Sequence, residues 1–90
     1  MGRIAARLAD LNIALPTPTT PVANYVPYVI AGKLAFISGQ VSIVNGALMK
    51  GRLGADVSLD DGIAAARACG VNLLAQLNHA LGGDLDRVRR

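Results

Sequence analysis

The sequence has few of the residue types that usually carry metal, redox or acid–base chemistry: its 90 residues include one cysteine, one histidine and no glutamate. One cysteine cannot form an intramolecular disulfide, and Cys69 lacks the companion residues that a metal site would need. Its position among alanines favours a packing role over a nucleophilic one. We therefore expect no metal site and no cofactor, and the cysteine content is typical of the reducing cytoplasm.

The sequence also lacks a long hydrophobic run. No apolar stretch approaches the ~18 residues of a membrane-spanning helix, so no transmembrane segment is expected. Residues 1–10 contain two arginines and only a short apolar stretch, without the small-residue cleavage site that follows a signal sequence. They are predicted to form a short amphipathic helix, and the protein is expected to be cytoplasmic.

Aromatic residues are scarce as well, which bears on nucleic-acid binding. Three aromatic side chains offer little surface for base stacking, and the nine lysines and arginines are scattered, except for a cluster at Arg87, Arg89 and Arg90. A nucleic-acid surface is therefore not indicated, and the cluster is interpreted as solvated charges. With 52% hydrophobic and 17% charged residues, the chain is expected to form one globular domain over residues 1–90. Such a short chain buries a smaller fraction of its surface than a domain of ~150 residues.

The strongest pattern that the sequence does contain is a hairpin. A two-residue turn at Gly32-Lys33 joins two runs rich in β-branched and aromatic residues, and glycine at the first turn position accepts the positive φ of a type II′ turn. The second run, residues 34–40, is predicted to be a central strand. Its alternation places Ser38 in one row with Phe36, so a hydroxyl follows core-type side chains. A serine before a glycine is also an ordinary turn residue, and the local sequence does not distinguish the two roles.

The segments on either side of this hairpin are shorter. Residues 15–22 hold three prolines and can continue neither a helix nor a central strand, so they are predicted to form an extended linker. Asn45-Gly46 is the strongest short turn signal, and residues 41–50 are predicted to form a second hairpin around it. Near the C-terminal end, residues 84–86 are predicted to form a turn, and residues 87–89 the start of another strand.

One long helix is predicted from Ser58 to Leu81. The Ser58 hydroxyl can accept an N–H of the first turn, two aspartates follow at the positive end of the helix dipole, and Gly82-Gly83 supplies the stop. An apolar stripe at helical spacing is predicted to pack on the sheet. Its members are Ile63, Ala66, Gly70, Leu74, Leu77 and Leu81. The opposite, polar side carries Asp61, Asn72, Gln76 and His79. His79 has no second histidine or glutamate with which to act as a metal ligand or general base.

Four stretches, taken in order, resemble the RidA family, also called the YjgF or endoribonuclease L-PSP family. The first has an aromatic residue seven positions before a turn glycine and ends in Ser-Gly-Gln. A Gly-Ala-Asp-Val-Ser segment, a helix with Ala-Ala-Ala-Arg and Asn-Leu-Leu, and a Gly-Asp-Leu-Asp-Arg-Val segment follow. They lie at residues 25–40, 54–58, 64–74 and 83–88. The resemblance covers essentially the whole chain, but only about the N-terminal two-thirds of a typical family member.

The resemblance implies an α+β, chorismate-mutase-like fold, in which a mixed sheet has the long helix on one face and is truncated at the C-terminal end. It also implies a homotrimer that hydrolyses small reactive enamines and imines derived from amino acids, of the 2-aminoacrylate type, to 2-keto acids and ammonia. By position, Tyr25 and Ser38 match the family's catalytic tyrosine and serine, and Gly39 supplies substrate-binding backbone at the same corner. The family's carboxylate-binding arginine and water-positioning acid would fall beyond Arg90, so the 90-residue chain alone is expected to be inactive.

Two other functions stay open at this point. The older family label implies an endoribonuclease, but the sequence offers few base-stacking aromatics and no pair of histidines for RNA cleavage. The chain could instead belong to a non-catalytic ligand-binding or stress-related module that keeps the cleft between subunits. An arginine followed by a glutamate in the C-terminal part of the protein would favour the enzyme.

Overall fold

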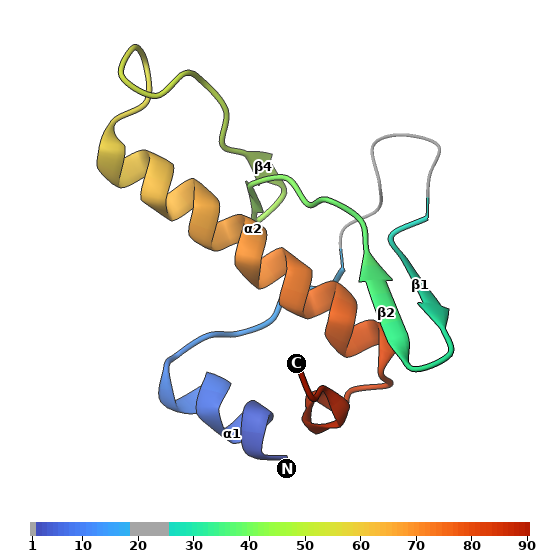
Figure 1. The fold of residues 1–90 in the computed structure, drawn as a ribbon. Coiled ribbons are helices and arrows are strands. Elements are labelled where there is room, and N and C mark those ends of the chain that lie inside the picture. The colour runs from blue at the N-terminus through green and yellow to red at the C-terminus, as the bar shows by residue number, and fades with distance from the viewer. Residues whose placement is uncertain (1, 19–25) are drawn as a thin grey trace.

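The computed structural model describes residues 2–18 and 26–90, which contain two α-helices and a set of short strands (Figure 1). The elements in chain order are α1 (Arg3–Asp10), β1 (Tyr28–Ala31), β2 (Leu34–Ile37), β3 (Ile43–Val44), β4 (Ala47–Leu48), α2 (Leu59–Ala80) and the 3₁₀ helix η1 (Leu85–Arg87). The long helix α2 runs through the middle of the molecule and contacts both hairpins, β1–β2 and β3–β4. This confirms the predicted α+β class.

Both hairpin turns form where the sequence predicts them. Gly32 has a φ of +60° at the first position of the β1–β2 turn, as a type II′ turn requires. At the β3–β4 turn, Asn45 and Gly46 both have positive φ, 52° and 82°, which is the type I′ arrangement. The Ser42 hydroxyl extends this second hairpin by donating a hydrogen bond to the Met49 carbonyl at 2.6 Å.

Strand β2 is shorter than predicted and is not central within the described residues. Its ladder with β1 stops at Ile37, and Ser38 adds one bond by donating its N–H to the Pro27 carbonyl at 2.9 Å. Pro27 has no N–H with which to return that bond, so the ladder ends there. In the part of the chain that the structure describes, β2 pairs with β1 alone and leaves its other edge open.

Helix α2 confirms the predicted boundaries. Ser58 is its N-cap, and the Ser58 hydroxyl accepts the Asp61 N–H at 3.1 Å. The helix ends at Ala80, and Gly82 and Gly83 follow with φ values of 63° and 91°. No helix in residues 2–18 or 26–90 is long and apolar enough to cross a membrane.

The face of α2 that is buried differs from the predicted one. Ile63 is 58% exposed and Ala66 is exposed as well, while the rest of the predicted stripe is half-buried. The most buried helix residues are two alanines and two amides at helical spacing, Ala68, Ala75, Asn72 and Gln76. The prediction that Asn72 and Gln76 lie on the outer, polar side is therefore wrong.

Hydrogen bonding explains why an amide occupies this inner face. The Asn72 side chain is only 3% exposed, and its Nδ2 donates to the Val41 carbonyl at 3.0 Å and to the Ile43 carbonyl at 3.1 Å. A buried amide without partners is costly, and the two carbonyls that accept from Asn72 compensate for its burial. The neighbouring alanines let the strand segment approach the helix closely.

The N-terminal helix α1 forms as predicted and is joined to the other end of the chain. The Asp86 carboxylate accepts the N–H of Arg3 at 2.7 Å and the N–H of Ile4 at 2.8 Å. These hydrogen bonds, that of Ile4 first, lower the pKa of Asp86 below its ordinary value. Unpaired N–H groups at a helix start favour such an acceptor, so Asp86 caps α1 from 82 residues away.

The predicted strand at residues 87–89 is wrong. Leu85–Arg87 forms the 3₁₀ helix η1, because Arg87 donates its N–H to the Asp84 carbonyl and Val88 donates to that of Leu85. Leu85 is buried, at 6% exposure, and fixes this turn. The predicted extended linker at residues 15–22 contains no helix or strand up to Pro18, and its remainder lies outside the described residues.

Replacing Asn72 by alanine should destabilise the fold. Asn72→Ala removes the donor from two carbonyls, and we expect the free energy of unfolding to fall by about 1–3 kcal/mol. Asn78→Ala is the matched control, since Asn78 lies on the same helix and its side chain makes no hydrogen bond within the described residues. Urea unfolding measures both variants, and equal losses would contradict the role given to Asn72.

Acid should release α1 from η1. Because the pKa of Asp86 is lowered in the folded state, its contribution is fully present above the pKa of the unfolded chain. That contribution is lost as the pH falls through the lowered, folded-state pKa. Amide exchange of Arg3 and Ile4 should accelerate over this acidic range.

In Asp86→Asn the two amides should already exchange fast at neutral pH, because the neutral side chain has one acceptor oxygen in place of two. Asp84→Asn serves as the control, since the side chain of Asp84 has no such bonds among the described residues. Protection of Arg3 and Ile4 that is unchanged in Asp86→Asn would contradict the cap.

Candidate active-site corner

Ser38 lies at the corner where β2 ends, and both its backbone and its side chain are tied to the strand opposite. The hydroxyl donates to the Val26 carbonyl at 2.6 Å, and the N–H donates to the Pro27 carbonyl at 2.9 Å. The hydroxyl proton is thus committed, while the oxygen keeps lone pairs that can accept a hydrogen bond. Ser38 is half-buried, so this oxygen is held in a fixed position at the surface.

Gly39 and Gln40 complete this corner. Gly39 is exposed, and a Cβ placed on it would meet nothing within 4 Å, so its backbone can be approached from outside. The Gln40 side chain donates from Nε2 to the Ser38 carbonyl at 3.0 Å and to that of Gly39 at 3.3 Å. In the sequence Gln40 is only the end of the Ser-Gly-Gln motif, and its role in holding its two neighbours is visible only in the structure.

Of the predicted site residues, the structure describes Ser38 and Gly39, which are neighbours in the sequence and lie together at this corner. Tyr25 lies outside the described residues, and in the sequence it directly precedes Val26, the acceptor of the Ser38 hydroxyl. The predicted catalytic role of Tyr25 therefore stays a prediction. No group of three or more histidine, cysteine or acidic side chains in residues 2–18 and 26–90 is arranged to hold a metal ion.

The corner adjoins an uncovered apolar face of the hairpin. Tyr28 and Ile37 are directly paired and lie on the side of α2, so the alternate residues point the other way. Val29, Leu34 and Phe36 are on that outer side and are 49%, 63% and 57% exposed. Ser38 continues the row of Leu34 and Phe36 beyond the strand end. The side chains that the sequence ranked as core-type are thus exposed in the single chain.

A tyrosine–histidine pair that sequence reasoning missed joins the hairpin to α2. The Tyr28 hydroxyl lies 2.6 Å from Nδ1 of His79, and the ring centroids are 5.8 Å apart with an interplanar angle of 55°. The two residues are 51 positions apart, and nothing in the local sequence of either one signals the other. His79, considered without a partner from the sequence, thus has one in the fold.

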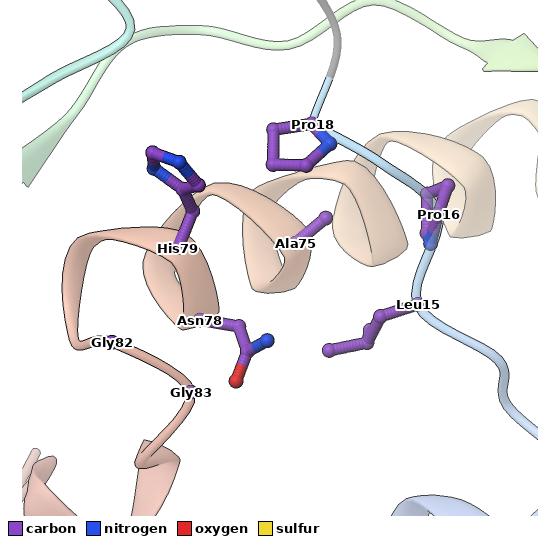
Figure 2. Close-up of a pocket in the computed structure, with 8 residues that line it drawn as sticks. All are labelled: Leu15, Pro16, Pro18, Ala75, Asn78, His79, Gly82 and Gly83. Atoms are coloured by element: carbon purple, nitrogen blue, oxygen red, sulfur yellow. The ribbon is translucent and has the colours of Figure 1, made fainter.

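His79 also borders a cavity of about 410 Å³ between the N-terminal segment and the end of α2 (Figure 2). The figure shows Leu15 and the Asn78 amide pointing toward each other across it, with Pro18 near His79. The lining residues are Leu15, Pro16, Pro18, Ala75, Asn78, His79, Gly82 and Gly83. None of them belongs to the Ser38 corner, so this cavity and the corner are separate features.

Comparison with known proteins places these features in a family. A family described as "YjgF/chorismate mutase-like, putative endoribonuclease" matches residues 5–90. The chain is 47% identical over 90 residues to Protein TCP17 of Trypanosoma cruzi. This match covers 99% of this chain and 56% of that protein.

Two crystal structures share the fold. One is a putative endoribonuclease from Shewanella oneidensis MR-1, with a TM-score of 0.88, 37% identity and coverage of 96% of this chain and 57% of that one. The other is Atu1372 from Agrobacterium tumefaciens, with a TM-score of 0.83, 42% identity and coverage of 97% and 53%. The chain spans little more than half the length of these relatives. Since the family match extends over nearly every residue and the solved structures superpose on the same elements, this chain belongs to the YjgF/chorismate mutase-like family and has its α+β fold.

Proposed function

We propose that this chain forms the substrate-orienting part of an enamine/imine deaminase, which hydrolyses small amino-acid-derived imines of the 2-aminoacrylate type to 2-keto acids and ammonia. The observation that carries the proposal is the Ser38 corner. There a hydroxyl oxygen with free lone pairs is fixed beside open glycine backbone. Family membership supports the proposal, because the resemblance carries the family's catalytic serine and substrate-binding backbone to Ser38 and Gly39.

The hydrogen bonds of Ser38 define what it can do in this reaction. Its proton is donated to the Val26 carbonyl, so the oxygen is an acceptor for an imine or iminium N–H, or for a water molecule. A serine nucleophile would need an adjacent base, and Nδ1 of the one histidine is engaged with Tyr28. We therefore assign Ser38 to orienting the C=N group, with water as the nucleophile.

The remaining steps follow from the chemistry of imines. Water adds to the C=N carbon, the nitrogen takes up protons, and the carbinolamine expels ammonia to leave the 2-keto acid. Tyr25 is proposed as the second hydroxyl that orients the substrate, and the Gly39 backbone as part of its binding surface. A guanidinium for the substrate carboxylate and an acid that positions the water are also needed, and we place both beyond Arg90.

We further propose that the protein is a homotrimer with its site between subunits. The uncovered face of Val29, Leu34 and Phe36 supports this, because exposed apolar patches usually mark interaction surfaces. This face ends at Ser38, so a second subunit packed on it would come close to the corner. That arrangement offers a route by which groups from a neighbouring chain reach the substrate.

The deaminase proposal is tested with 2-aminoacrylate generated by a serine dehydratase, following keto-acid release. The 90-residue chain should show little or no activity, and a version extended with the C-terminal part of TCP17 should be active. In the extended version, Ser38→Ala should lower kcat/KM by about 10²-fold, as expected for loss of one oriented polar contact in the transition state. Tyr25→Phe should also reduce activity.

Ser42→Ala is the matched control, because the Ser42 hydroxyl also donates to a carbonyl at 2.6 Å but lies in the second hairpin. It should leave kcat/KM unchanged. Full activity from the 90-residue chain would overturn the site assignment. No activity from a well-folded extended trimer would instead favour a ligand-binding module.

The trimer is tested separately, by sedimentation of the extended version. Phe36→Asp puts a charge in the middle of the uncovered face and should convert the trimer to monomers. Leu59→Asp is the control, since Leu59 is 74% exposed in the first turn of α2, where an acidic residue suits the helix dipole. A stable monomer of the unmodified protein at micromolar concentration would contradict both the trimer and the intersubunit site.

A further inference from the structure

A second cavity, of about 290 Å³, lies between the N-terminal segment, the β3–β4 hairpin and the middle of α2. No residue of the Ser38 corner lines it, and it is distinct from the cavity beside His79, with which it shares only Pro16. It adjoins a hydrogen-bonded junction, because Asn72 lines it and donates to the carbonyls of Val41 and Ile43. The cavity is therefore built on a fixed helix–strand contact.

The walls of this cavity are mainly apolar. Pro16, Val44 and Val71 contribute branched or cyclic side chains, and the small side chain of Ala64 leaves room between them. At about 290 Å³ the space is at the lower end of the ~300–1,000 Å³ of ligand pockets, and it suits a short, branched molecule.

One charged group borders these apolar walls. Arg67 is the single charged residue that lines the cavity, and no aspartate lies among the lining residues. Within the described residues its guanidinium makes no hydrogen bond and no ion pair, so its donors are available. A guanidinium presents paired N–H donors that match a carboxylate, and the adjacent turn residue Asn45 offers a further amide donor.

We infer that this cavity binds a short branched-chain carboxylate, with the carboxylate on Arg67 and the apolar body against Val44, Val71 and Pro16. The inference does not depend on the deaminase activity, because the cavity and the Ser38 corner share no residue. It assigns Arg67 a ligand-binding role that the helix pattern alone did not indicate.

The test is calorimetric titration of the chain with 4-methyl-2-oxopentanoate, compared with 4-methylpentanamide, which keeps the branched body but lacks the carboxylate. The acid should bind at least 10-fold more tightly than the amide. Arg67→Gln should weaken binding of the acid by about 10- to 100-fold, as expected for loss of a charge-assisted hydrogen bond. Ala64→Leu should abolish binding of both compounds by filling the space, while it keeps the arginine at position 67.

A control separates this site from general effects. Arg52→Gln removes an exposed arginine outside the cavity and should leave binding unchanged. Circular dichroism checks that each variant is folded. Equal affinity for acid and amide, unchanged binding in Arg67→Gln or Ala64→Leu, or no binding by the folded chain at millimolar acid would each overturn the inference.

Discussion

The contact on which the rest of the structure depends is the hydrogen-bonded junction between Asn72 and the segment that follows β2. One buried amide holds two carbonyls, at Val41 and Ile43, against the middle of the long helix. The Ser38 corner lies directly upstream of Val41 and is tied on its other side to Val26 and Pro27. The corner is thus fixed from both sides, which is the condition for a side chain that orients a ligand.

The two faces of the β1–β2 hairpin differ in their surroundings because α2 packs against only one of them. On the covered side, Tyr28 joins the hairpin to the helix through His79. On the other side, Phe36 and its apolar neighbours are exposed. A two-stranded hairpin is barely stable by itself, so the helix contact provides its support and the outer face is left available for association. The proposed trimer would cover that face.

Much of the local structure could be predicted from the sequence, because it depends on neighbouring residues. The turns at Gly32 and Asn45-Gly46 and the cap at Ser58 each follow from the conformational preferences of one or two residues. The end of the long helix before Gly82 and Gly83 follows in the same way.

The parts that could not be predicted depend on partners far away in the chain. Hydropathy placed Asn72 on the outside, since a single sequence does not show which carbonyls an amide will meet 29 and 31 residues upstream. The Tyr28–His79 pair and the cap of α1 by Asp86 were missed for the same reason. Residues 87–89 look like a strand start, but buried Leu85 and two backbone hydrogen bonds between residues three apart favour a 3₁₀ turn instead.

The described part of the corner contains no charged side chain, and this limits the part that it can take in the proposed chemistry. A hydroxyl acceptor and open backbone can align a C=N group, but attack by water also requires the substrate carboxylate to be neutralised and a proton to be moved. Arg67 does not meet this need, because it lies at a cavity that shares no residue with the corner. The proposed reaction therefore needs charged groups other than those of the described corner. The apolar face that ends at Ser38 gives a neighbouring subunit a place from which to reach the same substrate.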